Sequence, residues 1–157
     1  EEKIASFVAP NDGYYALLIN PGTGTFFISS INEPMMLYVP EGNKIHLIRT
    51  GNIYFWVGSI SHFNIEFEGE GTEEGLTATI SKPTAAGYQL VTSGSTTQLK
   101  NSFSLSVDVS AGDVNKIWNL TISKPSLPQG FEDVFINFDN NIPPYFSLTD
   151  NESYFMR

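Results

Sequence analysis

The chain has 157 residues, no Cys, and a formal net charge of −9 from 17 Asp and Glu against 8 Lys and Arg. The absence of Cys excludes disulfides, thiol catalysis and thiolate metal sites, and the acidic excess argues against binding to nucleic acid, whose phosphates attract cations. No stretch reaches the roughly 20 apolar residues of a membrane span. The length suits one domain, so we predict a single domain over residues 1–157 with no membrane span.

Short apolar or alternating runs follow one another along the chain, and no run of ten or more residues has the apolar spacing of a helix. In chain order the predicted strands span residues 14–20, 25–31, 35–39, 44–49, 53–57, 62–68, 76–81, 87–91, 98–109, 115–123 and 131–138. Turns rich in Gly, Pro, Asn and Asp separate them. This pattern predicts an all-β fold, an antiparallel sandwich of two sheets that is similar to a jelly roll.

Alternation within the strands predicts which side chains are buried, because successive residues of a strand point to opposite faces of a sheet. Apolar residues occupy every second position in four of the runs, and polar residues fill most of the positions between them. The predicted core residues are Ile53, Phe55, Val57, Phe63, Ile65, Phe67, Phe103, Leu105, Val107, Val109, Trp118, Leu120 and Ile122.

The run 53–57 carries two aromatic residues on its outward face. Tyr54 and Trp56 are two positions apart and therefore point to the same side. If this strand pairs with the run 62–68 as a hairpin, the polar side chains of His62, Asn64 and Glu66 lie beside the two rings. We therefore predict a carbohydrate-binding platform from these five residues. In the alternative, another strand or a loop covers Tyr54 and Trp56.

No motif for catalysis is present. The sequence has no Gly-x-Ser-x-Gly, phosphate-binding loop, dinucleotide fingerprint or His-Glu-x-x-His, and His46 and His62 both lie in predicted strands. We assign no catalytic residue and predict that the chain is not an enzyme. A small β-sandwich glycan hydrolase or lyase remains an alternative, which two close carboxylates in a deep cleft would indicate.

The segment 66–74 is acidic and interrupted by Gly, but it lacks a calcium-loop motif. We interpret it as the solvated tip of a hairpin and predict no cofactor. Near the end of the chain, Tyr145 and Phe146 follow two Pro residues. They either anchor the tail over the core or stay exposed at a partner surface.

Several segments together resemble a known kind of β-sandwich. They are Gly13–Ile19, Met36–Lys44, Asp113–Ile122, Phe131–Ile136 and Ile142–Phe146. Over roughly residues 13–146 the chain is similar to the galactose-binding-like jelly roll and to the pre-peptidase C-terminal type of domain. Such domains occur beside the catalytic domains of bacterial glycan-degrading and other exported enzymes.

The resemblance implies a non-catalytic accessory module that binds a polysaccharide or oligosaccharide, beside a catalytic domain of its parent chain. It also implies a secreted or cell-surface bacterial protein. A structural Ca²⁺ is a further implication, to which Asp133 or Asp139 would contribute. The chain begins at Glu1 with no visible signal peptide, which we interpret as the mature part or an excised domain of a longer protein. The main rival is a structural or protein–protein interaction module that packs on a neighbouring domain.

Overall fold

The computed structural model describes residues 8, 10–11, 36–40, 42–71, 73–126, 129–131 and 133–150. The chain divides into two units, Glu1–Asn32 and Glu33–Arg157, and the fold described here is that of the second unit. The predicted strands 14–20 and 25–31 lie outside the described residues. A single domain over residues 1–157 therefore stays a prediction.

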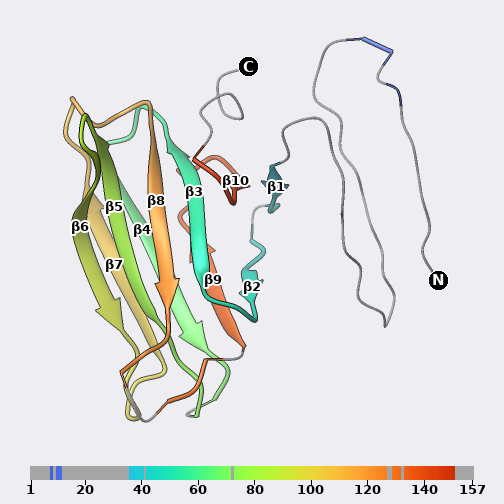
Figure 1. The fold of residues 1–157 in the computed structure, drawn as a ribbon, viewed down its shortest axis with the longest axis vertical. Helices are drawn as coiled ribbons and strands as arrows, with labels where there is room; N and C mark the ends of the chain where they lie inside the picture. The colour runs from blue at the N-terminus through green and yellow to red at the C-terminus, as the bar shows by residue number, and fades with distance from the viewer. Residues whose placement is uncertain are drawn as a thin grey trace. The chain divides into compact units, whose positions relative to one another are not determined.

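Ten strands form two antiparallel sheets that pack face to face, which confirms the predicted sandwich (Figure 1). The described residues contain no helix, and so none that is long and apolar enough to cross a membrane. The strands are β1 (Leu37–Tyr38), β2 (Ile45–Leu47), β3 (Gly51–Val57), β4 (His62–Gly69), β5 (Thr77–Thr84), β6 (Gly87–Ser95), β7 (Ser102–Asp108), β8 (Lys116–Ser123), β9 (Val134–Phe138) and β10 (Tyr145–Ser147).

The strands pair in a nested order. The first strand pairs with the last, β2 with β9, β3 with β8, β4 with β7, and β5 with β6. Successive pairs alternate between the sheets, which gives the orders β1-β10-β3-β8-β5-β6 and β2-β9-β4-β7. This is the arrangement of a long two-stranded ribbon rolled up into two layers, and it confirms the jelly-roll topology.

The core lies between the two sheets and is rich in Phe. Phe55 of β3 and Phe63 of β4 are fully buried and meet edge to face across the two layers, with ring centroids 5.7 Å apart. Phe63 makes a second edge-to-face contact with Trp118 of β8, at 5.6 Å. The alternation of apolar residues therefore predicted the inward-facing residues correctly. Phe103 is the one predicted core residue that is half-buried, and it still packs against the hydrophobic core.

A loop between β7 and β8 closes one end of the core over Trp118. The indole N–H of Trp118 donates a hydrogen bond to the backbone carbonyl of Asp113 at 3.1 Å. This bond satisfies the only hydrogen-bond donor of the indole ring. The Asp113 carboxylate accepts hydrogen bonds from Lys82 Nζ at 2.8 Å and from Ser110 Oγ at 2.7 Å. These bonds, with that from Lys82 the largest cause, lower the pKa of Asp113 from the ordinary 3.8 to about 2.

A depressed pKa in the folded state means that Asp113 stabilises the fold above its unfolded pKa, and that this contribution disappears as the pH falls toward 2. We expect Asp113→Asn to be less stable than the wild type at pH 7, and the difference to shrink between pH 4 and pH 2. Urea unfolding curves across this range measure it. Glu73→Gln is the control, because that side chain is exposed. A difference for Asp113→Asn that does not change with pH would contradict the assignment.

Candidate functional site

The five residues predicted to form one platform lie on opposite sides of the sandwich. β3 belongs to the six-stranded sheet and β4 to the four-stranded sheet (Figure 1). By their burial patterns, Tyr54 and Trp56 point outward from β3, whereas His62, Asn64 and Glu66 point outward from β4. The expected hairpin between these strands was wrong, because the short connection 58–61 crosses from one sheet to the other. The inner faces of β3 and β4 meet across the core and are not neighbours in one sheet.

The three polar residues are engaged with neighbours in their own sheet. His62 Nδ1 lies 2.9 Å from Asp108 Oδ1, and Asn137 Nδ2 donates to Glu66 Oε2 at 3.0 Å. Asn64 accepts a hydrogen bond from the Ser106 hydroxyl. These are cross-strand pairs along an outer sheet surface, and they lie too far from Tyr54 and Trp56 to complete a common site.

Tyr54 and Trp56 instead belong to a larger aromatic surface, which we call the aromatic face. Cross-strand partners share a face of a sheet, and the register Tyr38↔Tyr145, Ser147↔Tyr54 and Pro83↔Tyr88 assigns all of these aromatic residues to the outer side of the six-stranded sheet. The rings of Tyr38 and Tyr145 are 5.3 Å apart, and those of Tyr54 and Tyr88 are 5.8 Å apart. The aromatic face consists of Tyr38, Tyr54, Trp56, Tyr88 and Tyr145.

The two outer surfaces of the sandwich differ in charge. None of the described strand residues that point outward from the six-stranded sheet is charged, and hydroxyl and amide side chains surround the rings. The outer surface of the four-stranded sheet carries ionisable side chains, namely His46, His62, Glu66, Glu68 and Asp108. The polar residues nearest to the aromatic face are Asn52, Thr79, Ser81, Asn119, Thr121 and Ser147.

The hydroxyl of Tyr54 is held in its neutral form. Burial raises the pKa of Tyr54, and the negative charge of Asp150 raises it further. A protonated phenol both donates and accepts hydrogen bonds. The ring of Tyr54 therefore offers an apolar surface and a polar tip at the same place.

Sequence reasoning missed three members of the aromatic face, Tyr38, Tyr88 and Tyr145. Tyr38 and Tyr88 lay in predicted strands, but the pairing that places them beside β3 joins segments far apart in the chain. Tyr145 lies in β10, which was not predicted as a strand, and it was expected either to anchor the tail or to stay exposed at a partner surface. Its neighbour Phe146 does anchor the tail, buried 4.5 Å from the ring of Phe138, while Tyr145 points outward. A nested pairing of the predicted strands, the first with the last and so on inward, could have placed these three tyrosines on one face.

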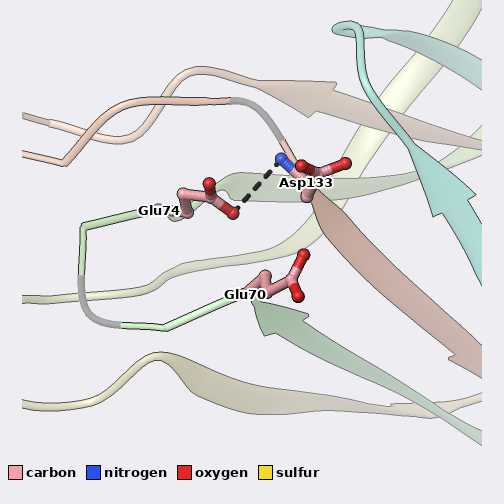
Figure 2. A group of neighbouring side chains, drawn as sticks. All are labelled: Glu70, Glu74 and Asp133. Atoms are coloured by element: carbon pink, nitrogen blue, oxygen red, sulfur yellow. Dashed lines mark hydrogen bonds between the residues drawn. The ribbon is translucent and has the colours of Figure 1, made fainter.

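A second group of side chains lies at one end of the sandwich, where Glu70, Glu74 and Asp133 approach one another (Figure 2). One carboxylate oxygen of each lies within 4.8 Å of the others. Gly69 makes this possible, because a Cβ at that position would overlap the backbone carbonyl of Glu74. The sequence predicted an acidic hairpin tip here and named Asp133 as a possible contributor, but it did not predict that the two would meet.

This acidic group offers few free ligand atoms. The Asp133 backbone N–H donates to Glu74 Oε2 at 3.3 Å, and Asp133 Oδ1 lies 2.6 Å from His46 Nε2. Calcium takes about six to eight oxygen ligands, so three carboxylates with these contacts would need further ligands. Asp139 is not part of the group. A bound Ca²⁺ remains a prediction from the resemblance stated above.

The fold and the two groups of side chains can be compared with known proteins. No family model matches the chain, and neither a curated protein nor a solved structure matches it. The resemblance to galactose-binding-like and pre-peptidase C-terminal domains therefore stays a prediction. What the chain shows of itself is a jelly-roll sandwich with one aromatic surface whose described strand residues carry no charge, although Asp150 acts on Tyr54 from outside the strands.

Proposed function

We propose that the chain is a non-catalytic accessory module of an exported bacterial protein, and that it binds neutral polysaccharides weakly through the aromatic face. The observation that carries the proposal is the contrast between the two outer surfaces. One presents five aromatic rings among uncharged hydroxyl and amide groups, and the other presents ionisable side chains. A surface without charge suits a ligand without charge, and the net charge of −9 would repel an acidic glycan.

The chemistry of sugars fits such a surface. A pyranose ring has a flat face of C–H groups and a rim of hydroxyl groups. The apolar face can pack on Trp56 and Tyr54, which removes apolar area from water. The rim can exchange hydrogen bonds with the phenol of Tyr54 and the neighbouring amide and hydroxyl side chains. His62, Asn64 and Glu66, on the opposite surface, take no part in this proposed site.

The acidic group supports no catalytic role. Glu70 is exposed and borders an open depression with Lys44 and Glu68, but Glu74 and Asp133 do not line that depression. The sign expected for a hydrolase was a pair of carboxylates in a deep cleft. Glu70, Glu74 and Asp133 lie instead at one end of the sandwich.

A second candidate function is docking of a protein partner. Tyr38 and Tyr145 are 55% and 49% exposed and contact each other. Exposed apolar residues that adjoin one another mark interaction surfaces in many proteins. This observation favours a partner at the β1–β10 end of the aromatic face.

The test separates the two candidates. The full chain is screened against a glycan array and by affinity gels that contain neutral polysaccharides, with and without Ca²⁺. We expect at least one neutral polysaccharide to retard the wild type, and Trp56→Ala to bind at least about tenfold more weakly. Phe135→Ala is the matched control, because Phe135 is a half-buried aromatic residue on the opposite outer surface. Equal binding by wild type and Trp56→Ala would contradict the proposed site, and no binding at all would favour a protein partner.

A further inference from the structure

Asn119 has an unusual position at the centre of the aromatic face. It points outward from β8, between Tyr54 of β3 and Ser81 of β5, which are its cross-strand partners. Asn119 is only 6% exposed, and the outward residues Ile117, Ser81 and Ser147 on the same side of the sheet are buried as well. Asn is also disfavoured in the middle of strands. The need to form a strand therefore does not explain why a buried Asn occupies this position of β8.

Two aromatic rings that meet above the middle of the sheet contribute to the cover of Asn119. The backbones of Tyr54 and Tyr88 lie on β3 and β6, and β8 and β5 run between them. Strands lie about 4.8 Å apart, so these backbones are separated by about 14 Å. The ring centroids are nevertheless 5.8 Å apart. Both rings must therefore lean over β8 and β5, where Asn119 and Ser81 are located.

The amide of Asn119 has one polar atom without a partner. Thr121 Oγ1 lies 2.8 Å from Asn119 Oδ1, while Asn119 Nδ2 is buried and has no hydrogen-bond partner among the described residues. The same Thr121 hydroxyl lies 2.8 Å from Asn52 Oδ1 and carries only one proton for the two oxygens. If the Asn119 amide turns end for end, Nδ2 donates to Thr121 and Oδ1 becomes the unpaired atom. In either orientation one buried polar atom lacks a partner.

A buried polar atom without a partner destabilises a fold. A partner that can serve an unpaired donor or an unpaired acceptor is a hydroxyl group, which does both. Tyr88 lies on the edge strand β6, next to the turn at Ala85 and Ala86, and its side chain is 40% exposed. A hydroxyl-bearing ligand could then reach Asn119 from the aromatic face.

We infer that Asn119 is a binding residue that pairs with a hydroxyl group of a neutral sugar when the rings of Tyr54 and Tyr88 move apart, an inference that rests on the proposed function. The two tyrosines then act as a cover that closes over the amide in the free protein. Asn119 would set the position of one sugar hydroxyl, while Trp56 supplies the stacking surface. The unpaired amide of Asn119 lowers the stability of the free protein, and its role in binding accounts for its presence.

The test uses Asn119→Val in the full chain, because Val has nearly the volume of Asn, favours strands and cannot hydrogen-bond. Asn137→Val is the matched control, the same substitution on β9 at the outer surface of the four-stranded sheet, away from the aromatic face. Urea unfolding gives stability. Binding is measured by NMR titration with cello-, xylo-, manno-, malto- and laminarihexaose. We expect Asn119→Val to be at least as stable as the wild type and to bind about tenfold more weakly. Asn137→Val should bind unchanged, and the side-chain amide signals of Asn119 should shift on titration.

Each other outcome overturns the inference in a recognisable way. If Asn119→Val unfolds at clearly lower urea than Asn137→Val, the amide is structural, for instance as a donor to a Tyr ring. If the wild type binds a hexasaccharide, Trp56→Ala loses binding and Asn119→Val keeps it, the aromatic face stands and the role of Asn119 falls. If the wild type binds none of the hexasaccharides and nothing on the array, the proposed function falls and the inference falls with it.

Discussion

Replacing Phe63 by Ala should lower the free energy of unfolding by about 3–5 kcal/mol, the usual cost of emptying a fully buried Phe site. Phe63 is not exposed at all, and its edge-to-face contacts with Phe55 and Trp118 join β4 of one sheet to β3 and β8 of the other. Close-packed side chains around it cannot collapse into the space. Urea unfolding at pH 7, followed by far-UV circular dichroism, measures the loss.

The control for this substitution is Phe135→Ala, the same chemical change on an outer surface. Phe135 is half-buried and stacks on His46 with ring centroids 4.7 Å apart. Its removal should cost about 1 kcal/mol or less. If the two variants lose similar stability, Phe63 is not the junction between the sheets that its contacts indicate.

Gly75→Ala should destabilise the chain by about 2–4 kcal/mol. A Cβ at Gly75 would overlap the hydroxyl of Thr96 and crowd the side chain of Gln129. These two buried residues hydrogen-bond to each other at 2.9 Å, and Thr96 also accepts the N–H of Leu76 at 3.0 Å. The added methyl group must push one of them away and leave buried polar atoms unpaired.

Gly112→Ala provides the comparison, because no atom lies within 4 Å of a Cβ built there and its φ is not positive. Its stability should stay within about 0.5 kcal/mol of the wild type. The quantity to measure is the difference in urea midpoint between the two Gly→Ala variants at pH 7. A Gly75→Ala variant as stable as Gly112→Ala would show that the network of Thr96 and Gln129 can rearrange freely.

The inner faces of the strands could be predicted from the sequence because alternation is a local property. Phe63, Ile65 and Phe67 alternate with polar residues, and all three are buried. The same reasoning predicted that Trp118 lies in the core. A period of two fixes which side of a strand is buried, and no knowledge of the partner strand is needed for that.

The candidate site could not be predicted in the same way, because a shared face depends on pairing between distant segments. Proximity in the chain suggested that β3 and β4 form a hairpin, yet each turns its outer face away from the other. Tyr54 instead lies beside Asn119 of β8 and close to Tyr88 of β6. The three-residue strand β10 was too short to show alternation, so Tyr145 could not be assigned to the aromatic face.

The nested order of strand pairs has a consequence for how the chain folds. The hairpin β5–β6 closes over a turn of two residues, whereas β1 and β10 come from opposite ends of the second unit. Closing a short loop costs the least chain entropy, and non-local pairings slow folding. We expect β5–β6 to form first and each outer pair to form on the one inside it. The aromatic face would then be completed late, since Tyr38 and Tyr145 belong to the outermost pair.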